Sequence, residues 1–105
     1  MITFPFIAGR SFLNYPTHPI TIRKACYPEL QTEGLTSGDV VVATADGHIR
    51  GIIYSGNAGW GPYYQIRARG KNPGDPSFTF AIGQHILVEI QKSQTGILVT
   101  LNVAE

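Results

Sequence analysis

The stretch LTSGDVVVATADGHIRGIIYSG, residues 35–56, places two short apolar runs on either side of an Asp-Gly pair. Asp-Gly supplies the two positive φ angles of a type I′ turn, so the stretch predicts a β-hairpin with Asp46 and Gly47 as its loop. In that register Ala45 faces His48, and Val41 faces Ile52. The predicted core face carries Val40, Val42, Ile49, Gly51 and Ile53.

The end of the chain predicts a second hairpin. HILVEIQ and ILVTLNV both alternate apolar and polar residues, and SQTG between them is typical of a turn. The expected inward side chains are Ile86, Val88, Ile90, Ile97, Val99, Leu101 and Val103.

Three further segments predict strands. YYQIRAR turns Tyr64, Ile66 and Ala68 to one face and Tyr63, Gln65, Arg67 and Arg69 to the other. PITIRKA buries Ile20 and Ile22, and SFTFAI buries Phe78, Phe80 and Ile82. A single helical turn is expected to start at residues 28–31 and to end at Gly34. Residues 55–62 and 70–77, rich in Gly, Pro, Asn and Asp, are expected to be connections.

These segments predict an all-β chain of six to eight strands, a small antiparallel β-barrel or sandwich. Residues 20–105 form its single domain. Residues 1–19 contain Pro5, Pro16 and Pro19, which cannot donate to a ladder, so we expect a sheet edge or an extended arm. This arm is apolar and must be buried, either against its own barrel or against a neighbour. Its expected contacts are Phe4, Phe6, Phe12 and Tyr15.

The composition describes a chain with few charges. Only 14% of the 105 residues are charged and 43% are hydrophobic, whereas about 25% are charged in a typical soluble domain. Sparse charge weakens the repulsion between monomers, so we expect another protein subunit to cover part of the surface, in a homo-oligomer or larger assembly. The net charge of +1 gives no overall field toward nucleic acid or a membrane.

No residue pattern predicts catalysis. The three histidines lie 30 or more residues apart, and no nucleophile motif or glycine-rich phosphate loop occurs. A single cysteine, Cys26, cannot form a disulfide within the chain, and we expect a small buried strand residue there. We therefore expect no enzyme, cofactor or metal site. The apolar runs are too short to span a membrane, and no signal peptide is recognisable, so export is not expected.

One segment, GWGPYYQIRARG at residues 59–70, concentrates aromatic rings and guanidinium groups. No carboxylate occurs between His48 and Gly74. Guanidinium groups bind phosphate or carboxylate, rings can stack on a base, and the same residue types anchor protein interfaces. Three interpretations stay open: a protein interface, a ligand or nucleic-acid site, and an ordinary sheet surface. The candidate residues are Trp60, Tyr63, Tyr64, Gln65, Arg67, Arg69 and Arg50.

Residues 35–56, with Gly38-Asp39 before a strand, a tight turn and a return through Gly51-Ile52-Ile53, resemble the core hairpin of small β-rich capsid decoration (cement) proteins of tailed phages. That resemblance implies a short non-enzymatic structural protein, found in the virion or the host cytoplasm, with an apolar arm over neighbouring subunits. Deleting residues 1–13 would then abolish assembly and leave a folded core. The alternative expectation is a small module that binds a phosphate-bearing ligand, a nucleotide or nucleic acid, such as a phage protein sequestering a signalling nucleotide.

Overall fold

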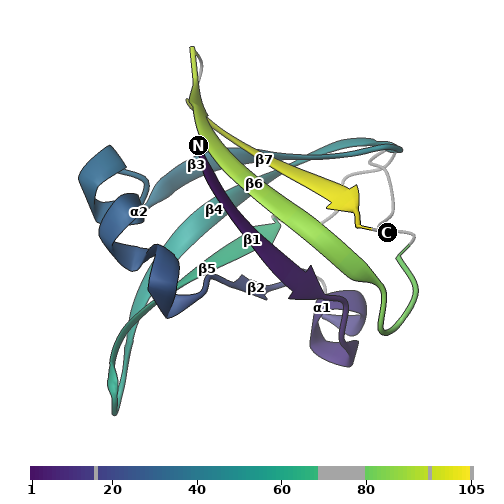
Figure 1. Cartoon of the computed structure of the whole chain (residues 1–105), viewed down its shortest axis with the longest axis horizontal. Coiled ribbons are helices and arrows are strands. Elements are labelled where there is room, and N and C mark those ends of the chain that lie inside the picture. Colours follow the sequence, from purple (N-terminus) through teal and green to yellow (C-terminus); the bar gives the residue numbers. More distant parts are fainter. Residues whose placement is uncertain (16, 69–79, 95, 105) are drawn as a thin grey trace.

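The computed structural model describes residues 1–15, 17–68, 80–94 and 96–104. Seven strands form one sheet in the order β1-β6-β7-β3-β4-β5-β2. The sheet coils into a nearly closed barrel whose two unpaired edges are β1 and β2 (Figure 1). The predicted all-β fold is confirmed, and it takes the barrel-like form.

The strands are β1 (Ile2–Ile7), β2 (Ile20–Thr21), β3 (Gly38–Thr44), β4 (Gly47–Ala58), β5 (Gly61–Ala68), β6 (His85–Ser93) and β7 (Gly96–Val103). Neighbouring strands are antiparallel except β3 and β7, which run parallel, so the expectation of a purely antiparallel barrel is wrong at this junction. The hairpin with β6 fixes the direction of β7, and β7 therefore meets β3 parallel.

Two short helices and one 3-10 turn accompany the barrel: α1 (Arg10–Asn14), η1 (Lys24–Cys26) and α2 (Tyr27–Glu33). Helix α2 ends where the sequence predicts, because Gly34 adopts a left-handed φ of 70° and receives no Cβ penalty there. Leu30 of α2 is fully buried. The Tyr27 ring, on the same helix, meets the Tyr64 ring of β5 edge to face at 4.7 Å, so α2 packs against the barrel.

The turn between β3 and β4 lies one residue earlier than the sequence suggests. Thr44 pairs with Gly47, so Ala45 and Asp46 form the turn, and Val41 faces Arg50 rather than Ile52. The Thr44 hydroxyl accepts a hydrogen bond from the Asp46 amide at 3.1 Å, and a φ of 138° falls on Gly47. The inward face is nevertheless confirmed, since moving both strands by one pair preserves the alternation.

The segment expected as a long connection, residues 55–62, is largely strand. β4 runs to Ala58 and β5 begins at Gly61, which pairs with it, so only Gly59 and Trp60 form the turn. The hairpin tip projects from the barrel at the lower left of Figure 1. The glycines that suggest a loop are compatible with the strands. Gly56 lies opposite the large Tyr63 side chain, and Gly61 is the first residue after the turn, paired with Ala58.

The predicted inward faces form the core. Its buried side chains include Ile20, Ile22, Val40, Val42, Ile53, Tyr64, Ile66, Ile86, Val88, Ile90, Val99 and Leu101. Val103 was expected inside but is 53% exposed at the end of β7. The strand expected at residues 77–82 is absent from its described part: Phe80 packs against the core, but Ile82 lies in a turn and is 67% exposed. Phe78 and the connection at residues 70–77 lie outside the described residues.

The extended N-terminal arm is not evident, and this expectation is corrected. Residues 2–7 form β1, which pairs with β6 along its whole length. Ala8 donates to the Gln84 carbonyl just beyond the strand, and the alternation of an antiparallel ladder then turns the Pro5 nitrogen away from β6. Pro5 therefore costs no ladder hydrogen bond, and the sheet-edge alternative is the one confirmed.

The aromatic residues assigned to the arm belong mostly to the protein's own core. Phe4 is 3% exposed and Phe12 1% exposed, and Phe6 meets Phe12 edge to face at 5.2 Å. Only Tyr15, 58% exposed, keeps the outward position that a contact with a neighbour would need.

Candidate functional site

The outer face of the β4–β5 hairpin carries the residues that the sequence singles out. Tyr63, Gln65 and Arg67 alternate with inward Tyr64, Ile66 and Ala68, as predicted, and all three are half-buried. Tyr54 of β4 lies directly opposite Gln65. It is therefore diagonal to both Tyr63 and Arg67, which is within reach of side chains of this length.

These side chains form one continuous row with a cation at each end. The Arg67 guanidinium lies 3.8 Å from the centre of the Tyr54 ring, and the Lys24 ammonium lies 4.3 Å from the centre of the Trp60 ring. Between them, the Tyr63 ring is 6.1 Å from that of Tyr54 and 6.2 Å from that of Trp60. We call Lys24, Tyr54, Trp60, Tyr63 and Arg67 the aromatic stripe.

A glycine sets the position of the central ring. Gly56 pairs with Tyr63, and a Cβ added at Gly56 would lie 2.5 Å from Cζ of the Tyr63 ring. The ring therefore lies across the backbone where β4 has no side chain. This placement brings Tyr63 between Tyr54 and Trp60 and makes the stripe continuous.

Hydrogen bonds hold the Arg67 end of the stripe. The Arg67 Nε donates to the Gln65 Oε1 at 3.0 Å, and the Gln65 Nε2 donates to the Thr21 hydroxyl oxygen at 3.0 Å. Both halves of the Gln65 amide are thus engaged. The chain of donors ties β5 to the edge strand β2 and restricts the guanidinium to the face of Tyr54.

The stripe is positively charged and partly open to solvent. Trp60, at the hairpin tip, is 59% exposed. Among the described residues, no carboxylate forms an ion pair with Lys24 or Arg67; the one ion pair joins the Met1 amino group to Glu33. Cation–π contacts at exposed sites contribute about 0.5–1 kcal/mol each, so they orient the rings while covering one face of each.

Tyr64 and Arg50 do not join the stripe, and Gln65 contacts it only through its hydrogen bond with Arg67. Tyr64 points inward, is 7% exposed, and its hydroxyl accepts a hydrogen bond from Gln31 at 3.2 Å. Arg69 lies outside the described residues. Arg50 is on the outer face of β4, two pairs beyond the stripe, toward β3.

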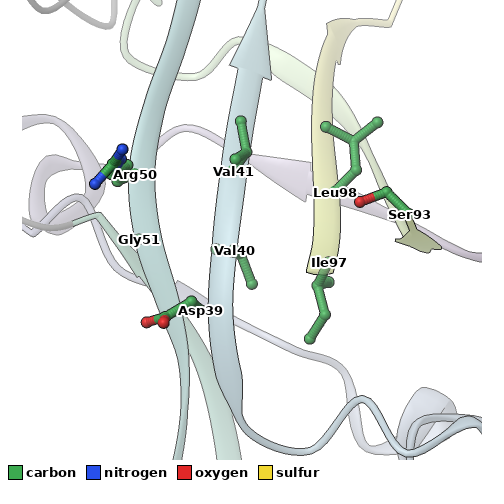
Figure 2. A pocket seen from close by; sticks show the side chains of 8 residues that line it. All are labelled: Asp39, Val40, Val41, Arg50, Gly51, Ser93, Ile97 and Leu98. Carbon is green, nitrogen blue, oxygen red and sulfur yellow. The ribbon is translucent and has the colours of Figure 1, made fainter. Parts of the chain in front are cut away.

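Arg50 lines a separate hollow of about 570 Å³ on the outer face of β3, β4 and β7. Figure 2 shows Arg50 and Asp39 on one side of this hollow and Leu98 and Ile97 on the other. The positive Arg50 and the negative Asp39 therefore lie on the same side of the hollow. None of the stripe residues contributes to its lining. The hollow therefore does not extend the stripe.

Sequence reasoning missed two members of the stripe. Tyr54 directly follows the inward Ile53 along β4, and this outward position was the one signal that could have identified it. Lys24 comes from η1, and nothing in the sequence indicates that this turn lies beside the hairpin tip, because the contact is purely tertiary. Thr21 was missed for the same reason.

The reactive side chains do not gather. Cys26 lies in η1 rather than in a strand, half-buried against the core. Burial raises the pKa of its thiol, and the Glu29 carboxylate raises this pKa further, while Arg23 opposes the shift. The buried His18 donates from Nδ1 to the Phe12 carbonyl at 2.7 Å. Within the described ranges, no group of three or more His, Cys, Asp or Glu side chains could hold a metal ion.

No helix in the described part of the chain is long and apolar enough to cross a membrane. Comparison with models of known protein families gives no match, and neither the curated proteins nor the solved structures compared with this chain give one. The function is therefore inferred from the geometry of the chain itself.

Proposed function

We propose that this protein is a non-enzymatic assembly subunit that buries the aromatic stripe against another protein subunit. The observation that supports this most directly is the stripe itself: five side chains from η1, β4 and β5 held in one row on a projecting hairpin. Trp, Tyr and Arg are the residues in which interface binding energy concentrates.

The shape of the stripe favours a large partner over a small ligand. The two rings at its ends each have one face occupied by a cation. A base would have to displace such a cation or use the opposite face. The hollow at Arg50 includes neither Trp60 nor Tyr63. A projecting surface of this kind fits against another surface rather than around a nucleotide.

Charge defines the kind of partner face. The stripe ends in two cations, and the surrounding sequence from His48 to Gly74 has no carboxylate. An opposing face with carboxylates would complement it, and complementary charge favours the correct pairing and its rate of formation. A second copy of the chain offers such a carboxylate on α2, where Glu29 is exposed. We therefore propose self-association first.

Decoration of a virus capsid is the specific form of this proposal, and the resemblance of residues 35–56 supports it. Such a role would place the protein in the virion or the host cytoplasm. In this proposal the aromatic stripe makes the contact with a neighbouring subunit that the sequence analysis expected from an arm at residues 1–19.

Light scattering of the purified protein, with its absorbance ratio at 260 and 280 nm, tests the proposal. We expect a defined oligomer that Trp60→Ala weakens by about 30-fold in Kd, which corresponds to the roughly 2 kcal/mol of an interface anchor. Tyr15→Ala is the matched control, because Tyr15 is about equally exposed but lies at the C-terminal end of α1 and not on the hairpin.

A monomer at all concentrations would contradict the proposal. So would an oligomer that Tyr15→Ala disrupts and Trp60→Ala does not. A raised 260 nm absorbance that Arg67→Ala removes would replace assembly by the alternative, a module for a phosphate-bearing ligand.

A further inference from the structure

The barrel has an open seam where its two edge strands, β1 and β2, do not pair. Helix α1 lies beside this seam, at the end of β1 (Figure 1). A hollow of about 440 Å³ lies at this seam. Its lining comes from β1, β2, α1 and β5. We call it the seam hollow.

The apolar part of the seam hollow includes Ile7 and Pro19 and is otherwise aromatic. Phe6 and Phe12 line it, and their rings meet edge to face at 5.2 Å. Tyr15, 58% exposed, lines it from the end of α1. Such a lining offers a flat apolar group a ring surface, because aromatic pairs prefer edge-to-face and offset contacts.

The polar part of the hollow consists of hydrogen-bond donors. Thr21 and Gln65 line it, and the Thr21 oxygen already accepts from the Gln65 amide. The hydroxyl hydrogen of Thr21 is consequently left to donate to a further acceptor. Because Gln65 in turn accepts from Arg67, the chain of donors runs from the guanidinium toward the hollow.

The only charged group in the described lining is positive. Arg10 is exposed at the hollow, and no Asp or Glu lines it. No described carboxylate forms an ion pair with Arg10. The hollow therefore combines aromatic rings, a hydroxyl donor and a guanidinium, and guanidinium groups bind carboxylate and phosphate with charge-assisted hydrogen bonds.

We infer that the seam hollow binds a small molecule that joins a flat apolar group to a carboxylate or phosphate. The flat group lies against the half-buried Phe6 ring and the exposed Tyr15 ring, and the buried Phe12 supports Phe6 from behind. The anionic oxygens accept hydrogen bonds from Arg10 and Thr21. This site lies apart from Trp60 and Tyr63, so it stands or falls independently of the proposed assembly.

A titration of the full ¹⁵N-labelled chain, followed by amide chemical shifts, tests the inference with three probes. Phenyl phosphate and benzoate carry the two candidate anions, and benzyl alcohol is the uncharged control. We expect one or both anions to shift the amides of residues 9–15 and of Thr21 saturably, with benzyl alcohol at least tenfold weaker. The anion that binds more tightly identifies the ligand class.

Variants locate the contact. Arg10→Gln and Thr21→Val should each weaken the better anion, Arg10→Gln by about tenfold. Arg23→Gln removes an exposed positive charge that does not line the hollow, and it should leave binding unchanged. The inference is overturned if no probe gives saturable shifts, if benzyl alcohol binds equally well, or if the shifts centre on Trp60 and Tyr63. Equal binding by the Arg10→Gln variant would also overturn it.

Discussion

At the scale of single residues, Gly51 decides how closely two strands approach. It pairs with Ala68, is buried, and leaves no room for a side chain: an added Cβ would lie 2.5 Å from the Arg67 carbonyl oxygen. That neighbour is backbone, which cannot rotate away. The predicted inward position of Gly51 thus has a steric reason that its place in the sequence does not reveal.

We expect Gly51→Ala to lower the free energy of unfolding by about 1–3 kcal/mol, the range for an overpacked core. Urea denaturation measures the change. Gly59→Ala is the matched control, since nothing lies within 4 Å of a Cβ at Gly59. Equal stability of the two variants would contradict the close approach of β4 and β5.

Cys26 should react slowly in the folded protein. Burial raises the pKa of its thiol, with the Glu29 carboxylate as the second cause, and the thiolate is the reactive form. We expect alkylation by iodoacetamide at neutral pH to be slower in the folded chain than in urea, and its rate to rise at a higher pH when the chain is folded.

The raised pKa of the Cys26 thiol also makes the stability of the fold depend on pH. Between the unfolded and the raised folded pKa, the unfolded chain holds fewer protons, so the thiol makes folding less favourable as pH rises through that window. Below the unfolded pKa it has no effect on stability. Equal alkylation rates with and without urea would show that the thiol is not shielded.

At the scale of elements, the sequence predicts the faces of strands better than their ends. The alternation in residues 40–53 and 85–103 identifies the core side chains of β3, β4, β6 and β7, because a period of two survives a shift in the turn. The predicted position of the turn depended on Asp46, because a type I′ turn with Asp-Gly has Asp as the first of its two loop residues. The Thr44 hydroxyl bond to the Asp46 amide favours the earlier turn instead.

The hairpin β4–β5 depends on Gly56 for its outer surface. Gly56→Ala would place a methyl group where the Tyr63 ring lies. Because the obstructing atoms belong to a side chain that can rotate, we expect unfolding free energy to change by less than about 1 kcal/mol while the stripe is interrupted. Self-association should weaken several-fold by light scattering. Gly59→Ala again serves as the control, and equal weakening in both variants would argue against the ring's role.

At the scale of the whole molecule, the N-terminal segment joins the barrel as an edge strand instead of reaching beyond it. Three prolines suggested an arm, yet Pro5 occupies the one kind of edge position that needs no donor. Long-range pairing of β1 with β6 could not be inferred from local pattern, since the partners lie 78 to 88 residues apart. The same holds for the candidate site. Tyr63 and Arg67 of β5 were predictable from the local pattern, whereas the contacts of Lys24 from η1 and Thr21 from β2 were not.

Deletion of residues 1–13 should therefore unfold the protein. The deletion removes β1 and the Phe12 side chain, whose loss alone costs about 3–5 kcal/mol in a core. Circular dichroism and thermal unfolding report the outcome. A truncated chain that unfolds cooperatively and keeps its strand spectrum would contradict the pairing of β1 with β6 and support an extended arm instead.

The most direct measurement of the central claim is acrylamide quenching of Trp60 fluorescence across protein concentration, with mass followed by light scattering. Trp60 is the chain's one tryptophan, so emission reports the hairpin tip alone. We expect the Trp60 emission to shift to shorter wavelength and acrylamide quenching to fall as the associated form appears. A larger assembly in which Trp60 stays as accessible as in the monomer would show that the aromatic stripe is not the interface.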